Sequence, residues 1–213
     1  MHFIEEDVLK ILITNEEINT RCQELAKEID NDYKDKNPIL VCLLKGALPF
    51  LAKLLEHIKI PMEIDCIKVH SYSGTNSTGK VTIEHLKSEK YKNRHVILVE
   101  DIIDTGLTLN ETCKLFKEFG VESLEIMSLL NKPVLNKVEL NAKYIGFEIP
   151  NEFVIGFGLD YNEQYRNLPY IGIMNNFQRL FPVLAVPSRA DWSLASLRIR
   201  ESFHLAAYSE PAC

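Results

Sequence analysis

Short apolar runs recur along the chain, and stretches with helical periodicity separate them. Residues 39–44 (ILVCLL) are apolar without interruption, which is typical of a strand covered on both faces. Residues 95–99 and 124–130 repeat this pattern, while residues 63–70 alternate between apolar and polar as a half-buried strand does. Further strands that complete the sheet are expected near residues 144–149 and 153–157.

The helical stretches carry their own start signals. Thr14 and Glu17 have the spacing of a capping box, and apolar residues follow them at every third or fourth position. Thr108 and Glu111 repeat this spacing and are expected to open another helix, which ends at a glycine. The two helices expected after the first one cover residues 49–57 and 108–120.

Strands that alternate with helices indicate an α/β fold in which helices flank a central, mostly parallel sheet. Such sheets bind ligands outside the carboxyl ends of their strands. Two of the expected strands end on residues that carry chemistry: Lys45 and Gly46 follow one of them, and Glu100 and Asp101 follow the other. The sequence therefore predicts a ligand site at this edge of the sheet.

Residues 100–108 (EDIIDTGLT) place acids, hydroxyls and a glycine directly after a buried strand. Free N–H groups and the positive dipole end of the following helix favour a phosphate, and the threonine hydroxyls add donors. The carboxylates of Glu100 and Asp101 suit the hydroxyls of a ribose or a magnesium ion. Two acids alone could simply end a strand in solvent, and a threonine could simply cap a helix. The two acids and the threonines, combined with Asp104, predict a site for a phosphorylated sugar.

Composition narrows the class of protein. A chain of 213 residues with 46% hydrophobic and 25% charged residues fits one globular domain, or one domain with a small appendage. No apolar run is long enough to span a bilayer, and no signal peptide is visible. The net charge of −6 argues against a nucleic-acid partner. Five cysteines without CxxC spacing indicate free thiols and a cytoplasmic location. Neither GxxxxGK[ST] nor GxGxxG occurs, so the two familiar nucleotide-binding loops are unsupported.

The run VILVEDIIDTGLT resembles the phosphoribosyl pyrophosphate motif of the type I phosphoribosyltransferase family. Over residues 5–177 the chain is similar to the hypoxanthine-guanine branch of this family. The segments that carry this likeness are LLKGALPF (43–50), SYSGTNSTG (71–79), SLLNK (128–132) and GFEIPNEFVIGFGLDYNEQYRNLPYIG (146–172). The acidic motif is specific to the superfamily, and the last segment is specific to enzymes that use 6-oxopurines. The resemblance implies the type I fold, with a small hood region beside the sheet.

The resemblance also implies roles for the residues that hold the sugar and its phosphates. Glu100 and Asp101 would lie near the ribose hydroxyls. The cradle of the 5′-phosphate would consist of Thr105, Gly106, Leu107 and Thr108; Leu107 replaces a lysine of some relatives. The residues implied to bind pyrophosphate are Lys45, Gly46 and Arg166, with a non-proline cis peptide in the neighbourhood of Leu44 and Lys45. The mobile loop that closes over the site would include Ser71 and Tyr72. Magnesium would be associated with Glu100, Asp101 and Asp160.

At the purine, the resemblance makes Asp104 the acid or base next to the imidazole nitrogen. Phe153 would stack on the base, and Val154 would offer backbone contacts. Lys132 would contact the exocyclic oxygen. A lysine donates hydrogen bonds and does not accept them, so this residue favours a 6-oxopurine over adenine. Without the family match, Lys132 and Phe153 would be read as a strand end and as plain core.

The implied reaction belongs to purine salvage. Hypoxanthine or guanine would react with phosphoribosyl pyrophosphate to give IMP or GMP and pyrophosphate, in a homodimer or homotetramer without nucleic-acid or membrane partners. Two alternatives remain open: an RNA-binding regulator on the same fold, and a phosphoribosyltransferase for another base such as adenine or orotate.

The end of the chain differs in composition from the rest. Up to residue 177 the sequence holds seventeen lysines and three arginines, whereas residues 178–213 hold four arginines, no lysine and the only tryptophan. We therefore expect a phosphoribosyltransferase domain over residues 1–177 and a tail that derives from vector sequence or a frameshift. A genuine extension that packs on the body or on a partner is the alternative.

Overall fold

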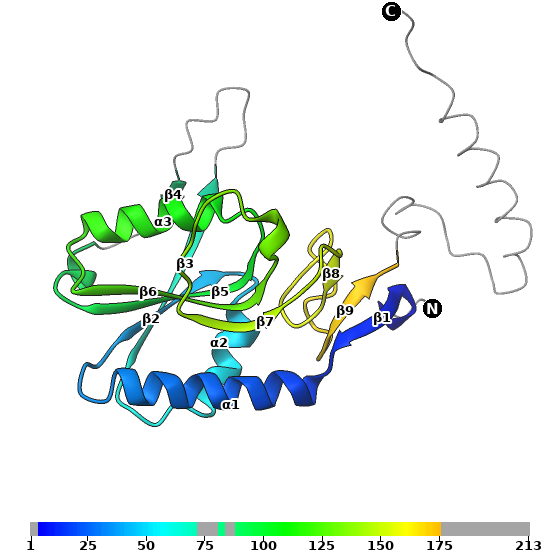
Figure 1. Ribbon diagram of the computed structural model, residues 1–213, viewed down its shortest axis with the longest axis horizontal. Coiled ribbons are helices and arrows are strands. Elements are labelled where there is room, and N and C mark those ends of the chain that lie inside the picture. The colour runs from blue at the N-terminus through cyan, green and yellow to red at the C-terminus, as the bar shows by residue number, and fades with distance from the viewer. Residues whose placement is uncertain (1–3, 72–80, 84–87, 176–213) are drawn as a thin grey trace, which may run out of the picture. The chain divides into compact units, whose positions relative to one another are not determined.

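The computed structural model describes residues 4–71, 81–83 and 88–175. Contacts divide the chain into two units, Met1–Met174 and Asn175–Cys213, and the description below concerns the first. The centre of this unit is a six-stranded sheet (Figure 1). Its strands, in spatial order, are β4 (Val81–Ile83), β3 (Glu63–Ser71), β2 (Ile39–Leu44), β5 (His95–Ile103), β6 (Ser123–Asn131) and β7 (Tyr144–Glu148). All neighbours pair in parallel except β4, which lies antiparallel at the edge. The predicted α/β class and mostly parallel sheet are confirmed.

Helices cover both faces of this sheet. The helices α1 (Asn15–Asp32) and α2 (Leu48–Leu55) lie on one face, and α3 (Leu107–Glu118) lies on the other (Figure 1). Alternate residues of β2 supply the two cores: Leu40 and Cys42 pack with α1 and α2, whereas Val41 packs with α3. The uninterrupted apolar run at β2 thus reflects burial on both sides.

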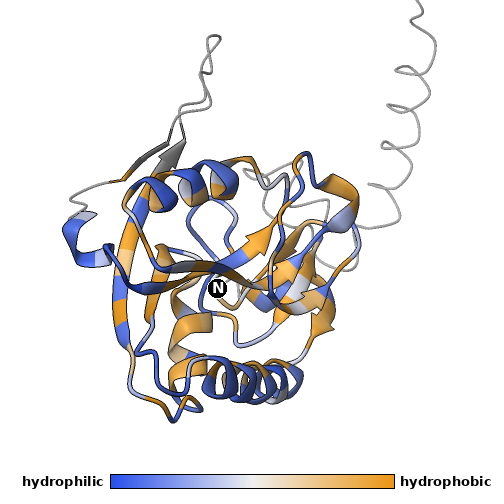
Figure 2. Cartoon of the chain, turned by 60° about the vertical axis from the view of Figure 1, so that its left-hand side comes forward, coloured by the Kyte–Doolittle hydropathy of each residue, from blue (hydrophilic) through white to orange (hydrophobic). Residues whose placement is uncertain are grey.

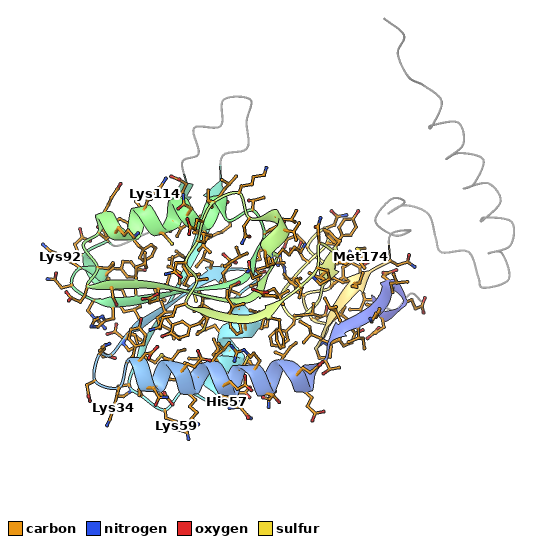
Figure 3. All side chains as sticks on the ribbon, in the orientation of Figure 1. Lys34, His57, Lys59, Lys92, Lys114 and Met174 are labelled. Carbon is orange, nitrogen blue, oxygen red and sulfur yellow. The ribbon has the colours of Figure 1, made fainter. Side chains whose placement is uncertain are left out.

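The first helix begins where the sequence predicts. The Thr14 hydroxyl accepts from the Glu17 N–H at 3.2 Å, and the Glu17 carboxylate accepts from the Thr14 N–H at 2.8 Å, so the capping box is confirmed. Figure 2 shows that α1 is hydrophobic toward the sheet and hydrophilic outside. Arg21 joins the helix to β7 by donating to the carbonyls of Ile145 and Gly146 at 2.8 and 3.1 Å. Lys34 and Lys59 near α1, and Lys92 and Lys114 on the opposite side, lie at the periphery (Figure 3).

A second, smaller sheet corresponds to the expected hood. It is antiparallel and has the order β1 (Val8–Ile13), β9 (Ile171–Met174), β8 (Val154–Ile155). Figure 3 labels Met174 at the end of β9. The expectation that residues 153–157 complete the main sheet was wrong, because only two of them are extended and these pair with β9. Short 3-10 helices lie at Ile4–Asp7, Ser88–Tyr91 and Pro133–Leu135.

The start of α3 corrects another prediction. The helix begins at Leu107, so Thr108 already lies inside its first turn and does not cap it. Gly106 takes the cap position with φ of +75° and no side-chain cap, while Glu111 accepts from Lys114 at 2.7 Å instead. The capping box of Thr108 and Glu111 is therefore not formed. The backbone N–H groups at this helix end keep their capacity to bind a ligand.

The chain order of the strands creates the position for a site. From β2 the chain moves outward to β3, and it then returns to the other side of β2 as β5 and continues to β6 and β7. The strand order therefore reverses between β2 and β5, and ligands of open α/β sheets bind at such a point. None of the helices in the described part of the chain is long and apolar enough to cross a membrane.

Candidate active site

The loops that follow β2 and β5 meet at the point where the strand order reverses. A Cβ atom built on Gly46 would overlap Oδ2 of Asp101, so a larger residue would fit here only if this carboxylate moved. The peptide bond between Leu44 and Lys45 is cis, as the family resemblance implied. Gly158 approaches from the hood: a Cβ atom there would overlap the carbonyl oxygen of Gly46. Three segments far apart in sequence therefore meet at Gly46, which contacts the side chain of Asp101 and the backbone of Gly158.

The two adjacent acids lie inside β5 and not after it. The strand continues to Ile103 because its parallel pairing with β6 continues in one register through Glu100, Ile102 and Ile103. The Asp101 N–H donates to the Glu100 carboxylate at 3.0 Å, and the Ile102 N–H donates to the Asp101 carboxylate at 2.9 Å. Burial raises the pKa of Glu100 well above its usual range, and the neighbouring Asp101 contributes to this shift. A cation beside the pair would favour its charged form.

A pocket of about 130 Å³ opens beside Glu100, and Asp101 is not among the residues that line it. The first residue after β5, Asp104, is exposed and contributes to its wall, and Gly106 lies where the pocket meets the start of α3. Gly106 also has no room for a side chain, because a Cβ atom would come within 2.7 Å of Leu140. The residues that line the pocket are Glu100, Ile102, Ile103, Asp104, Thr105, Gly106, Thr108 and Leu109. Of the expected phosphate cradle, Leu107 alone is absent from this lining, and its side chain is 46% exposed.

The end of β6 lies next to Asp104. The Lys132 N–H donates to the carbonyl of Ile103 at 2.9 Å, which holds Lys132 against the last residue of β5. Although this lysine is only 7% exposed, its ammonium group forms no hydrogen bond or ion pair with any residue that the structure describes. With its amide turned to satisfy the surrounding acceptors, Asn136 donates to the carbonyls of Asp104 and Lys132 at 2.8 and 3.2 Å. Asn136 thereby joins the two residues that are expected to contact a purine.

The cations expected for pyrophosphate are linked through one acid. Lys45 donates to Glu163 at 2.7 Å, and Arg166 lies 3.5 Å from the other oxygen of the same carboxylate. Arg166 also pairs with Asp160 at 2.8 Å and donates to the carbonyl of Gly158 at 2.7 Å. The hydrogen bond from Lys45 holds the pKa of Glu163 below its ordinary value, and the charges of Lys45 and Arg166 add to this effect.

The remaining expected residues lie in the hood and on β3. The ring of Phe153 packs edge-on against Tyr161 at a centroid distance of 5.7 Å, and Val154 is buried in β8. Ser71 ends β3, and its side chain is not described; Tyr72 lies outside the described residues.

The described residues contain no metal site that is formed by protein ligands alone. Within residues 4–71, 81–83 and 88–175, no group of three or more His, Cys, Asp or Glu side chains is placed to hold an ion. Glu100 and Asp101 therefore do not form such a group with Asp160, which is occupied by Arg166. Magnesium commonly takes only one or two protein carboxylates and completes its shell with water and substrate phosphates. The adjacent pair Glu100 and Asp101 fits that mode.

Known proteins match both the sequence and the fold. A model of the phosphoribosyl transferase domain family matches residues 10–162. The chain is 48% identical over 172 residues to a hypoxanthine-guanine phosphoribosyltransferase of Streptococcus pneumoniae, which covers 80% of this chain and 96% of that protein. The relative of the same name from Bacillus subtilis is 43% identical with the same coverage. A crystal structure of a hypoxanthine phosphoribosyltransferase from Staphylococcus aureus matches with a TM-score of 0.78 and 41% identity, over 84% of this chain and 96% of that one.

The chain belongs to the hypoxanthine-guanine phosphoribosyltransferase family. Membership confirms the resemblance that the acidic motif and the segment at residues 146–172 indicated. It also places the chain among transferases.

Sequence reasoning missed three residues of this phosphoribosyltransferase site. Glu163 joins the two expected pyrophosphate cations, Asn136 joins Asp104 to Lys132, and Gly158 lets the hood approach Gly46. Glu163 and Gly158 lie inside the family-like segment at residues 146–172, so that segment already marked their neighbourhood. No sequence signal singled out Asn136.

Proposed function

We propose that this enzyme transfers the 5-phosphoribosyl group from phosphoribosyl pyrophosphate to hypoxanthine or guanine in purine salvage, forming IMP or GMP and releasing pyrophosphate. Family membership supports the reaction. The single structural observation that carries it is the pocket of about 130 Å³ in which Glu100, Asp104 and the start of α3 face one ligand volume. This volume combines groups for a pentose, a phosphate and a purine nitrogen.

The sugar phosphate is proposed to bind at the start of α3. The N–H groups of the first turn, together with the Thr105 and Thr108 hydroxyls, donate to the 5′-phosphate. Each hydrogen bond to a charged group contributes about 1.5–3 kcal/mol, so these donors replace the charge of the lysine that some relatives have at Leu107. Glu100 and Asp101 accept from the two ribose hydroxyls. The contact of Asp101 with Gly46 keeps this carboxylate at the switch point.

During the transfer, the bond from the ribose to pyrophosphate breaks as a bond to the purine nitrogen forms. Positive charge develops on the sugar ring, and negative charge develops on the departing pyrophosphate. Lys45 and Arg166 are proposed to stabilise the leaving group, and the acids near the ribose stabilise the ring. Asp104 takes the proton from the purine's imidazole nitrogen. Closure of the loop that contains Ser71 and Tyr72 would exclude water from the activated sugar.

The purine is proposed to lie between Lys132 and the hood. Lys132 is 7% exposed, and its ammonium group, which has no partner among the described residues, donates to the exocyclic oxygen of a 6-oxopurine. Phe153 stacks on the ring, and the backbone of Val154 contacts its edge. An adenine amino group would leave the lysine donor unpaired.

Magnesium is the proposed cofactor, held by Glu100 and Asp101 and, in the closed site, associated with Asp160. It supplies charge neutralisation for the pyrophosphate oxygens when it is bound. Self-association into a dimer or tetramer is likewise proposed from the family. A reducing cytoplasm is proposed from the free thiols of Cys22, Cys42, Cys66 and Cys113.

A substrate panel tests the proposal. The purified chain is incubated with phosphoribosyl pyrophosphate, magnesium and hypoxanthine, guanine, xanthine or adenine, and nucleotide and pyrophosphate are quantified separately. The proposal requires equal amounts of nucleotide and pyrophosphate with hypoxanthine or guanine. Turnover of adenine alone would favour a transferase for another base. An RNA-binding regulator would give no purine-dependent pyrophosphate, and the net charge of −6 offers no support for it.

A further inference from the structure

Glu163 occupies an unusual backbone position in the hood. Tyr161 and Gln164 exchange two backbone hydrogen bonds of 3.1 and 3.2 Å across a tight turn. The two central residues of this turn, Asn162 and Glu163, have φ angles of +51° and +64°. Asparagine and glycine are common in this left-handed region, whereas glutamate is rarely found there. Turn geometry therefore does not account for the glutamate.

The side chain of Glu163 bridges the two cations that are proposed to bind pyrophosphate. One carboxylate oxygen lies 2.7 Å from Nζ of Lys45, and the other lies 3.5 Å from Nη2 of Arg166. A bound pyrophosphate would offer the same two cations more charge and more acceptor oxygens. The carboxylate and the pyrophosphate group therefore compete for the same partners.

The contacts of Glu163 with Lys45 and Arg166 can break without displacing Arg166. The Lys45 and Glu163 side chains are 58% and 66% exposed, and exposed ion pairs are weak. Arg166 is held independently, because it also pairs with Asp160 at 2.8 Å and donates to the Gly158 carbonyl at 2.7 Å. Its Nε atom is buried and has no hydrogen-bond partner among the described residues. Loss of the Glu163 contact thus leaves Arg166 in position with a donor to spare.

We propose that Glu163 is a displaceable internal anion, which occupies Lys45 and Arg166 in the free enzyme and yields them to the pyrophosphate group of the substrate. This inference rests on the proposed function. Because a ligand must displace the Glu163 carboxylate before it can bind the two cations, this competition lowers the affinity of the enzyme for ligands that carry pyrophosphate. The return of the carboxylate to the two cations assists the release of pyrophosphate. Glu163 is accordingly a positioning residue that acts through Lys45 and Arg166.

The test compares Glu163→Gln with the wild type and with Glu56→Gln. Glutamine keeps the size of the side chain and removes its charge. Glu56, the C-cap residue of α2, is 55% exposed and pairs with Lys53 at 3.0 Å, so Glu56→Gln controls for the loss of an exposed, ion-paired carboxylate. Steady-state kinetics with hypoxanthine give the KM of phosphoribosyl pyrophosphate, the KM of hypoxanthine and the inhibition constant of pyrophosphate for each protein.

In Glu163→Gln, the KM of phosphoribosyl pyrophosphate and the inhibition constant of pyrophosphate should both fall about two- to fivefold, the span of an exposed ion pair. The KM of hypoxanthine should stay unchanged, and Glu56→Gln should behave as the wild type in all three constants. An unchanged or higher KM of phosphoribosyl pyrophosphate in Glu163→Gln would overturn the inference, since a purely supporting role predicts that result. A wild type without nucleotide formation would instead refute the proposed function itself.

Discussion

Gly46 and Asp101 are in direct contact at the switch point of the sheet, and the contact leaves no space for a Cβ atom on Gly46. Gly46 follows β2 and Asp101 lies near the end of β5, so this single contact joins the two loops that carry the proposed chemistry. The position of the carboxylate that is proposed to bind the ribose therefore depends on the smallest residue of the neighbouring loop.

Gly46→Ala should displace Asp101 and lower kcat/KM for phosphoribosyl pyrophosphate. Inserting a methyl group into a packed contact costs about 1–3 kcal/mol, which corresponds to roughly a 5- to 150-fold loss. Steady-state kinetics measure the loss. Asp101→Ala in the same background removes the obstructing carboxylate, so the effects of the two substitutions should be less than additive. Fully additive losses would show that the contact is not the cause.

Asp104→Asn should leave the fold intact and lower kcat by roughly 10²–10⁴, the usual contribution of a general acid or base. The side chain is exposed at the pocket wall, so its amide counterpart is accommodated without a packing cost. Single-turnover assays with hypoxanthine, together with the melting temperature, separate chemistry from stability. Unchanged turnover would remove Asp104 from the catalytic role.

Lys132→Met should raise the KM of hypoxanthine far more than the KM of phosphoribosyl pyrophosphate. Methionine retains the apolar stem in this 7%-exposed position and removes only the donor. Loss of a hydrogen bond from a charged group costs about 1.5–3 kcal/mol, or about 10- to 150-fold in affinity for the base. Lys132→Ala tests the same donor and also removes the stem. Equal increases of both KM values would contradict a role in reading the purine.

Stability should fall in acid through Asp32. Hydrogen bonds from Lys143 at 2.7 Å and from Tyr144 at 2.6 Å hold the pKa of the Asp32 carboxyl below its ordinary value. Because this pKa is lower in the folded than in the unfolded state, the stabilisation is present above about pH 4 and is lost as the pH falls through the folded-state pKa. Asp32 is 37% exposed, so screening limits the contribution to about 0.5 kcal/mol. Melting temperatures from about pH 3 to pH 7 should decline less steeply in Asp32→Asn than in the wild type. If the melting temperatures of the two proteins declined in parallel as the pH fell, groups other than Asp32 would be responsible for the acid sensitivity.

Removal of residues 178–213 should leave kcat and KM unchanged. This segment lies outside the described residues, and the family match ends at residue 162. A tail that derives from vector sequence or a frameshift contributes nothing to the site. A large loss of activity, or a change of oligomeric state in size-exclusion chromatography, would instead identify a genuine extension.

The parts of the fold that follow from burial could be predicted from the sequence. The run at residues 39–44 and the capping box of Thr14 appear in the structure where the pattern puts them, because both depend on residues close together in the chain. The hood could not be predicted in the same way. β8 has only two residues, and β1 pairs with β9, more than 150 residues away, so no local pattern in the sequence indicates this pairing.

In the candidate site, too, the local features could be predicted from the sequence, and the contacts between distant residues could not. The acids and the proposed phosphate loop lie in one continuous segment, so the sequence alone indicated residues 100–108 as a candidate site. The contacts of Gly46 with Asp101 and of Lys45 with Glu163 join positions that only the folded chain brings together. Two element boundaries also depend on tertiary structure: continued pairing of β5 with β6 extends the strand to Ile103, and α3 begins at Leu107 with Gly106 as its cap.

The central claim is that the switch point binds an activated pentose phosphate. Isothermal titration calorimetry of the intact chain with phosphoribosyl pyrophosphate in the presence of magnesium tests it most directly. Saturable binding at one site per chain, weakened in Gly46→Ala, is the expected result. A folded wild-type chain that takes up no phosphoribosyl pyrophosphate would contradict the account.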